Sequence, residues 1–474
     1  MTEKRKEPGH EYERIPYLVK FDDKAPFKDT YAGEIDRVVL EAHLLRPKGV
    51  PSKTVTIFMH PIGGGQYLPM INALARQGLH VIYCNSRYRG IDYSLTMERV
   101  AIDLGACVRD ARERLGYEKV LLGGWSGGGS LSLFYQAEAE DPRVRATPAG
   151  DPPDLVARGL LPADGVMLLA AHAARNITLT EWLDASILDE RDHTRRDPEL
   201  DLYGPDAPKP PYSAAFVARY RAAQIARNRR ITARVKQELA ALRASGQPDA
   251  ERPFVVYGTM CDVRWTDPTQ DPSDRRPYTC YLGEPRIAND GPVGLARFTT
   301  LRSWLSQWSL DESRADGLGN ASRISCPVLV VNNRADLACT PSQLLKLIKD
   351  HPAALEIQLR FYANALRRRV LRNPVDPEVL RRRHPPAVSR GLPGPGRCAG
   401  PGAAAAHAAP TGTGLAGRPP TALPRGGGVP LLHDRPRGRS GGVHRDRQGA
   451  RRRRLRVAVL RRERLRRHEP AHRR

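Results

Sequence analysis

A serine placed between glycines has the clearest chemical potential in this sequence. Ser126 stands in the segment GWSGG (residues 124–128), after the apolar run 120–122 and before the apolar segment 131–135. A serine hydroxyl is a weak nucleophile unless a base accepts its proton, and the flanking glycines let a strand turn sharply into a helix and expose the hydroxyl. Glycine-rich turns also bind phosphate, but no Lys-Ser or Lys-Thr pair follows these glycines, which disfavours that alternative. The pattern therefore predicts a nucleophilic serine.

The segments around this serine alternate between strand-like and helix-like patterns. Continuous apolar runs predict strands at 54–59, 81–85, 120–122, 166–171 and 328–331. Helical patterns separate them, and one of these spans 100–114. Such alternation is typical of βαβ units and a parallel sheet, and continuous apolar runs fit strands that are covered on both faces. We expect an α/β fold with a mostly parallel sheet and helices on both of its faces.

Two further motifs stand at the ends of predicted strands. The segment HPIGGG (residues 60–65) follows the first strand, and Asp336 follows the strand at 328–331. Together with Ser126, and in the same order, these motifs resemble the α/β-hydrolase superfamily over residues 31–365, apart from an insertion. The resemblance implies a serine hydrolase that cleaves a carboxylic ester or related acyl bond through an acyl-enzyme, without a metal or other cofactor. An acyltransferase that uses the same site is a close variant.

The resemblance assigns catalytic roles to two residues. Ser126 would be the nucleophile, and Asp336 the acid that orients a histidine and stabilises its cation. Two side chains are expected beside the substrate rather than in proton transfer, namely His60 and Trp125. The structural alternatives are a glycine loop that is only a turn and an aspartate that only caps a helix.

The same resemblance implies an oxyanion hole built from backbone amides. One donor would be the N–H of Gly127, directly after the nucleophile. Pro61 stands where the family usually has glycine, and proline has no N–H. The second donor would therefore be the N–H of Ile62 or Gly63.

The third member of the triad is absent from its place in the family. A histidine would follow the last strand, which the pattern predicts at 356–362, but the chain continues through Ala365 into a run of arginines. His172 precedes the acid, His351 precedes the last strand, and His384 lies in an arginine- and proline-rich stretch. We assign none of them as the base, so we expect impaired activity in the printed chain.

The composition changes abruptly at the same point. Residues 366–474 contain 28 arginines, no lysine and six acidic residues, so this segment carries +22 of the net charge of +24. It also lacks Phe, Tyr, Trp, Ile and Met. Out-of-frame reading of a GC-rich gene yields Arg, Gly, Pro and Ala in this way. If residues 363–368 are encoded by gcc aac gca cta cgc cgg, removal of the g after aac gives Ala-Asn-His-Tyr-Ala. We infer that one added nucleotide shifted the frame.

The alternative is a genuine basic tail. A segment of low hydrophobicity and high net charge does not fold by itself, and its arginines could bind nucleic acid by neutralising phosphates. Binding of single strands usually employs aromatic side chains, and residues 366–474 have none. A nucleic-acid-binding protein that acts through this tail is the second functional hypothesis.

A long insertion separates the predicted strands 166–171 and 328–331. Its roughly 150 residues are too many for a loop, and the resemblance implies a mainly helical cap over the nucleophile. A long helix should begin at Ser213 and end at Gly246, with an apolar face formed by Ile231, Val235, Leu239 and Leu242.

These features divide the chain into four parts. Residues 1–172 form the first part of the hydrolase core with the nucleophile, and 173–323 form the cap insertion. Residues 324–365 return to the core with the triad acid, and 366–474 form the tail, which we expect to be disordered.

Few other features bear on function. The N-terminus lacks the apolar run of a signal peptide, and no segment has membrane-spanning length. The seven cysteines are dispersed and odd in number, which indicates free thiols and a cytoplasmic protein. No metal-ligand spacing occurs among them. The expected partner is a small-molecule acyl substrate, whose identity stays open along with the oligomeric state.

Overall fold

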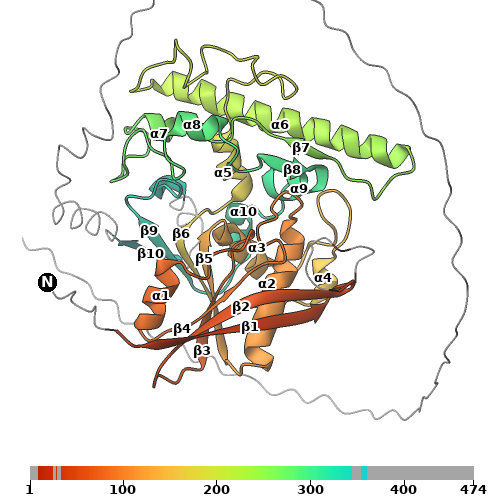
Figure 1. The fold of residues 1–474 in the computed structure, drawn as a ribbon, viewed down its shortest axis with the longest axis vertical. Coiled ribbons are helices and arrows are strands. Elements are labelled where there is room, and N and C mark those ends of the chain that lie inside the picture. Colours follow the sequence, from red (N-terminus) through yellow and green to blue (C-terminus); the bar gives the residue numbers. More distant parts are fainter. Residues whose placement is uncertain (1–8, 25–27, 29–33, 344–353, 360–474) are drawn as a thin grey trace, which may run out of the picture. The chain divides into compact units, whose positions relative to one another are not determined.

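The computed structural model describes residues 9–24, 28, 34–343 and 354–359 of the chain. Within these residues, eight strands form one sheet in the order β1-β2-β4-β3-β5-β6-β9-β10 (Figure 1). The strands are β1 (Tyr12–Asp22), β2 (Arg37–Pro47), β3 (Thr54–Phe58), β4 (His80–Cys84), β5 (Lys119–Ser126), β6 (Gly165–Ala171), β9 (Val328–Asn333) and β10 (Ala354–Leu359). The pairs β1–β2 and β2–β4 are antiparallel and the other pairs are parallel. The expected mostly parallel sheet is confirmed.

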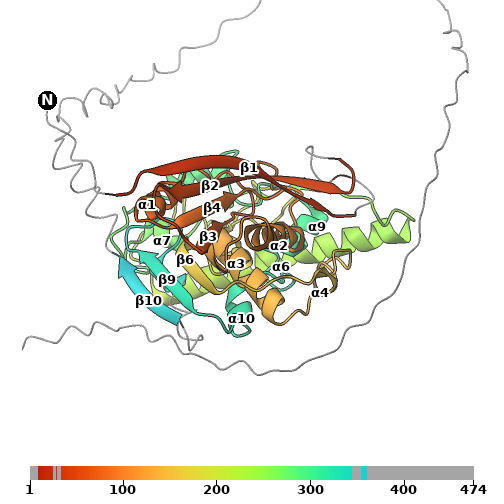
Figure 2. The same cartoon turned by 90° about the horizontal axis from the view of Figure 1, so that it is seen from below.

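Helices cover both faces of this sheet. Helices α2 (Met97–Glu113) and α3 (Gly128–Glu140) pack on one face, and α1 (Pro69–Arg76) packs on the other (Figure 2). Side chains of β3 alternate between two cores, because Val55 and Ile57 join the cluster under α2 and α3 while Phe58 joins the cluster under α1. The predicted cover on both faces is therefore confirmed.

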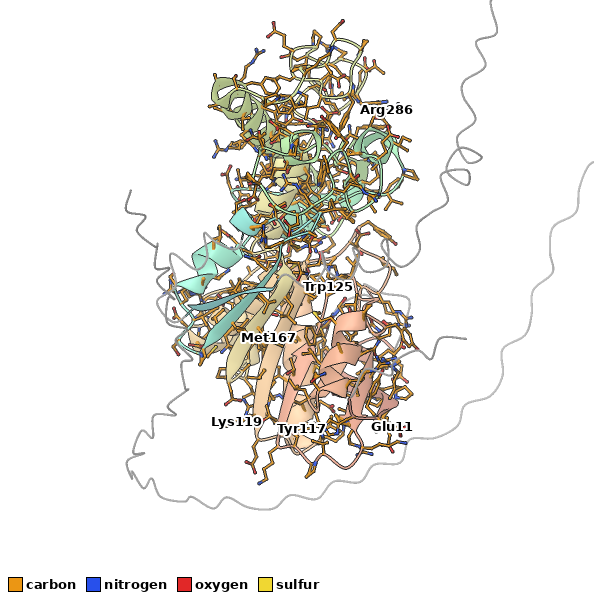
Figure 3. The ribbon with its side chains drawn as sticks, turned by 90° about the vertical axis from the view of Figure 1, so that its left-hand side faces the viewer. Glu11, Tyr117, Lys119, Trp125, Met167 and Arg286 are labelled. Atoms are coloured by element: carbon orange, nitrogen blue, oxygen red, sulfur yellow. The ribbon has the colours of Figure 1, made fainter. Side chains whose placement is uncertain are left out.

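A segment of mainly helical structure joins β6 to β9 beyond the carboxyl ends of the strands (Figure 1). Its elements are α5 (Arg175–Trp182), α6 (Ala214–Ala244), β7 (Pro253–Val255), α7 (Val263–Thr266), α8 (Pro285–Asp290), β8 (Phe298–Thr300), α9 (Leu301–Ser303), the π-helix η1 (Trp304–Trp308) and α10 (Gly317–Ala321). A further short helix, α4 (Leu155–Arg158), precedes β6. In Figure 3, Lys119 at the start of β5 lies far from this segment, whereas Trp125 near the end of β5 lies next to it.

The long helix α6 begins and ends as its sequence predicts. The hydroxyl of Ser213 accepts a hydrogen bond from the N–H of Phe216, which satisfies one unpaired donor of the first turn. Gly246 follows the helix in the left-handed region, with a φ of +74°, as is common for a glycine that ends a helix. The predicted apolar face is buried against Trp304 and Trp308, and it consists of Ile231, Val235, Leu239 and Leu242.

The π-helix η1 is fixed to the start of α2. The hydroxyl of Ser306 accepts a hydrogen bond from the N–H of Met97 and donates one to the carboxylate of Glu98, both at 2.7 Å. The amide of Gln307 donates to the backbone carbonyl of Leu95 at 3.2 Å. Burial raises the pKa of Glu98 to about 7. The segment between β6 and β9 is thus bonded to the sheet half of the molecule through buried polar groups.

Other expectations meet the described residues only in part. Within them, no helix is both long and apolar enough to cross a bilayer, and the six cysteines that they contain are free thiols. The last predicted strand, 356–362, overlaps β10, and its final residues fall outside the described part. The predictions for the missing histidine, for His351 and His384, and for residues 366–474 also lie outside it.

Candidate active site

A cavity of about 390 Å³ opens where β3, β5, β6 and β9 end. Its wall contains every residue that the sequence singled out for the site, namely Ser126, Asp336, Ile62, Gly63, Gly127, His60 and Trp125. Aromatic and aliphatic side chains form an apolar part of the wall, and these are Trp182, Tyr281, Leu295 and Trp308. The structure therefore brings together residues that are more than 200 positions apart in the sequence.

Ser126 occupies a sharp turn between β5 and α3. Its φ of +50° lies in the left-handed region, which non-glycine residues rarely adopt. The ladder between β5 and β6 shifts register at this residue. A methyl group on Gly128 would lie 2.5 Å from the carbonyl oxygen of Met59, so only glycine fits behind the turn. Ser126 is half-buried and faces the cavity, as the glycine-flanked pattern predicts.

Asp336 also lines this cavity, in the loop after β9. Its Oδ1 accepts the N–H groups of Ala338 and Cys339, both at 2.8 Å. Burial raises the pKa of Asp336, and these hydrogen bonds oppose the rise. Among the described residues, no histidine ring hydrogen-bonds to this carboxylate. The acid predicted from the sequence is in the cavity, but the described part of the chain supplies no histidine for it to orient.

His172 is one of two histidines in the cavity wall, and its ring is already engaged. Its Nδ1 lies 3.1 Å from the side-chain oxygen of Gln343 and 3.2 Å from the hydroxyl of Thr178. Its Nε2 lies 3.5 Å from the Sγ of Cys339. Burial lowers the pKa of His172 to about 4. None of these contacts connects Ser126 to Asp336, so His172 does not occupy the position of a triad base.

His60 is the second histidine of the wall, and its proton can be placed from its contacts. Its Nδ1 accepts the N–H of Ile62 at 3.3 Å. Burial, assisted by the charge of Arg175, lowers the pKa of His60 to about 3, so the ring is neutral. A neutral imidazole that accepts at Nδ1 carries its proton on Nε2. That Nε2–H faces the nucleophile turn, because a methyl group on Gly127 would lie 3.1 Å from it.

The two loop amides that the sequence predicts as oxyanion donors have acceptors within the loop. The N–H of Gly63 donates to the carbonyl oxygen of His60 at 2.8 Å, and the N–H of Ile62 donates to the His60 ring. Both N–H groups already have acceptors within the loop, and the assignment of Ile62 or Gly63 as an oxyanion donor stays a prediction. The N–H of Gly127, at the N-cap of α3, has no acceptor within that helix. Pro61 removes one further N–H donor from the same loop.

The sequence reasoning missed two charged residues of the cavity wall, Asp92 and, at the start of α5, Arg175. The side chain of Arg175 is buried, with 4% of the residue exposed, and its guanidinium lies 4.4 Å from the centre of the Trp308 ring. Nη2 donates to the side-chain oxygen of Gln307 at 2.6 Å. Burial lowers the pKa of Arg175 to about 10, which leaves the group cationic at neutral pH. The one sequence signal for Arg175 was its position shortly after the strand β6.

Comparisons with known proteins give similarities of fold only. No protein-family model matches the chain, and no curated protein matches its sequence. Est1E from Butyrivibrio proteoclasticus is 11% identical, with a TM-score of 0.34, over 68% of this chain and 84% of that one. The alpha/beta hydrolase GrgF from Penicillium sp. sh18 is 11% identical, with a TM-score of 0.36, over 78% and 98%. A proline iminopeptidase from Mycobacterium smegmatis is 15% identical, with a TM-score of 0.32, over 74% and 97%. Values this low say nothing about activity.

Proposed function

We propose that this chain, which has the α/β-hydrolase fold, is a serine hydrolase that cleaves a carboxylic ester or a related acyl bond. The observation that carries the proposal is the backbone of Ser126, whose φ of +50° turns a serine toward a cavity. Strained backbone of this kind persists where the surrounding structure enforces it, and such residues cluster at active sites. A serine that served only in packing would not require it.

The proposed reaction proceeds through an acyl-enzyme. The Oγ of Ser126 attacks the carbonyl carbon while a base accepts its proton, and the carbonyl oxygen becomes an oxyanion. The proposed donors to that oxygen are the N–H of Gly127 and the Nε2–H of His60, because both residues line the cavity and lie next to each other. Collapse of the intermediate expels the alcohol, and water then releases the acid by the same steps.

The proposed base is the histidine that the unshifted reading frame would place in the position of Ala365. Asp336 would hold this histidine in the right tautomer and stabilise its cation. Without a base, the oxyanion donors and substrate binding leave a residual acceleration on the order of 10³–10⁴ over water. We therefore expect the printed chain to be a slow version of the enzyme.

We further propose that residues 173–323 act as the cap of this hydrolase. They supply Trp182, Tyr281 and Trp308 to the cavity wall. These rings would bind an apolar acyl or alcohol group by burial. The core would then consist of residues 1–172 and 324–365.

Labelling by a fluorophosphonate tests the proposal, because the reagent requires an activated serine. We expect rapid labelling of a chain expressed in the unshifted frame, slow labelling of the printed chain, and none in Ser126→Ala. Ser130→Ala is the matched control, since this serine lies on α3 nearby and its hydroxyl bonds to the carbonyl of Gly127 at 3.0 Å. Labelling that persists in Ser126→Ala, or that maps to another residue, would refute the assignment.

A further inference from the structure

The cavity beside Ser126 contains a buried positive charge that the proposed reaction does not use. Within the described residues, the guanidinium of Arg175 forms no ion pair with a carboxylate, and its Nε has no hydrogen-bond partner. Its one side-chain acceptor is the neutral amide of Gln307. The acidic residue whose charge acts most strongly on it is Asp92, which lines the same cavity beyond ion-pair distance.

Such an arrangement is costly in the absence of a ligand. A buried arginine normally pairs with an acidic side chain, because removal of its charge from water is unfavourable. Arg227 and Arg87 follow that rule, since they bind Glu190 and Asp23, each at 2.7 Å. The buried Arg275 and Arg297 instead donate to several backbone carbonyls. Arg175 differs from them because it is held in place by a neutral amide and an aromatic ring, and its remaining donors border the cavity.

The guanidinium is also very near the nucleophile. A methyl group on Gly127 would lie 2.3 Å from Nη1 of Arg175, so this nitrogen touches the backbone of the residue that follows Ser126. An anion bound there would lie only a few bonds from a carbonyl group under attack by Ser126. Guanidinium nitrogens form a fork that matches the two oxygens of a carboxylate.

We propose that Arg175 is a binding site for a carboxylate of the substrate. The substrate class is then an acyl compound with a carboxylate close to the scissile carbonyl and an apolar body that packs on Trp182, Tyr281 and Trp308. The assignment of the scissile bond rests on the proposed function, whereas the carboxylate site itself does not.

Binding of a matched pair of probes tests the site without any need for catalysis. The probes are 3-phenylpropanoate and its neutral analogue 3-phenylpropanamide. The signal is the tryptophan fluorescence of the full chain, in which Trp308 should report binding because its ring stacks on Arg175. We expect the carboxylate to bind at least tenfold more tightly than the amide. Arg175→Gln should reduce this preference to less than twofold, and Arg175→Lys should keep part of it.

Two controls locate the effect. Arg286→Gln removes one positive charge from an exposed position of the inserted segment that lies well away from Trp125 (Figure 3), so it should keep the full preference. Ser126→Ala should keep it as well, because the probes are not cleaved. If Ser126 is not labelled by the fluorophosphonate but the preference exists, the proposed hydrolase fails and the carboxylate site stands.

Several results would overturn the site. The wild-type chain could bind both probes equally, which would leave Arg175 a purely structural residue or a donor to the oxyanion. Arg175→Gln could also retain the full preference. If Arg175→Gln does not fold, the site is judged from two measurements, the preference of the wild-type chain for the carboxylate probe and the preference that remains in Arg175→Lys. A loss of preference in Arg286→Gln as large as that in Arg175→Lys would refute a local site.

Discussion

The neutral state of His60 makes the stability of this protein depend on pH in a defined direction. The pKa of this ring falls from 6.5 to about 3 in the folded protein, because it is buried and faces the charge of Arg175. Below pH 6.5 the unfolded chain binds a proton at His60 that the folded chain does not bind. The folded state is therefore most stable with respect to His60 above pH 6.5. This contribution to the free energy of unfolding is lost progressively as the pH falls toward 3.

The size of the effect follows from the shift. Between pH 6.5 and pH 5 the folded ring stays neutral while the unfolded ring becomes charged, so about 2 kcal/mol of stability is lost. In His60→Gln this titration is absent, but the glutamine amide can still donate toward the cavity. The stability difference between wild type and variant should therefore change by about 2 kcal/mol between pH 8 and pH 5.

Urea unfolding of both proteins at pH 8, 7, 6 and 5 measures this change. The titration of His172 contributes to both proteins and largely cancels in the difference, even though its pKa is also lowered. Parallel stability curves for wild type and His60→Gln would mean that His60 titrates like an exposed histidine. The inference that its Nε2–H is a fixed donor to the oxyanion would then fail.

Three further predictions concern single substitutions. Ser126→Gly should be more stable to urea than Ser126→Ala by about 1 kcal/mol, because glycine adopts a φ of +50° without steric cost; equal stabilities would contradict the strained turn. Gly127→Ala should cost about 1–3 kcal/mol of stability, because its methyl group displaces Arg175. The same displacement should remove the preference for the carboxylate probe, and an unchanged preference would contradict the placement of Arg175 beside Gly127. Burial raises the pKa of Glu98 from 4.5 to about 7, so the contribution of Glu98 to wild-type stability should fall by about 3 kcal/mol as the pH rises through that interval. Glu98→Gln should lack this fall, and curves parallel to wild type would exclude the shift.

The sequence predicts those parts of the fold whose signals are local. The buried parallel strands appear as continuous apolar runs, and α6 has a capping serine, a periodic apolar face and a terminal glycine within one segment. In contrast, β1 and β2 were not predicted. The strand β1 mixes polar and apolar residues around Pro16, and it is held by antiparallel pairing with β2 across an intervening segment. Pairing between separate segments leaves only a weak pattern in either one.

The same division holds for the candidate site. Ser126 and Asp336 could be predicted to lie near one another because each stands at or just after the end of a strand, and parallel strands converge on one edge; both line the cavity. The hydrogen bonds of the HPIGGG loop depend on how its backbone turns around His60, which residue types alone do not define. Arg175 is oriented by Gln307, 132 positions later, so no local pattern could indicate its role.

The bonds between η1 and α2 limit how new specificities can arise in this protein. A chimera that received a foreign insertion between β6 and β9 would lose Gln307, which orients Arg175, and Ser306, which is the hydrogen-bond partner of Glu98. The recipient would keep a buried carboxyl group without its hydroxyl. Laboratory evolution of its substrate range should therefore proceed by point changes in the aromatic wall, or by transplanting the insertion together with residues 92–98.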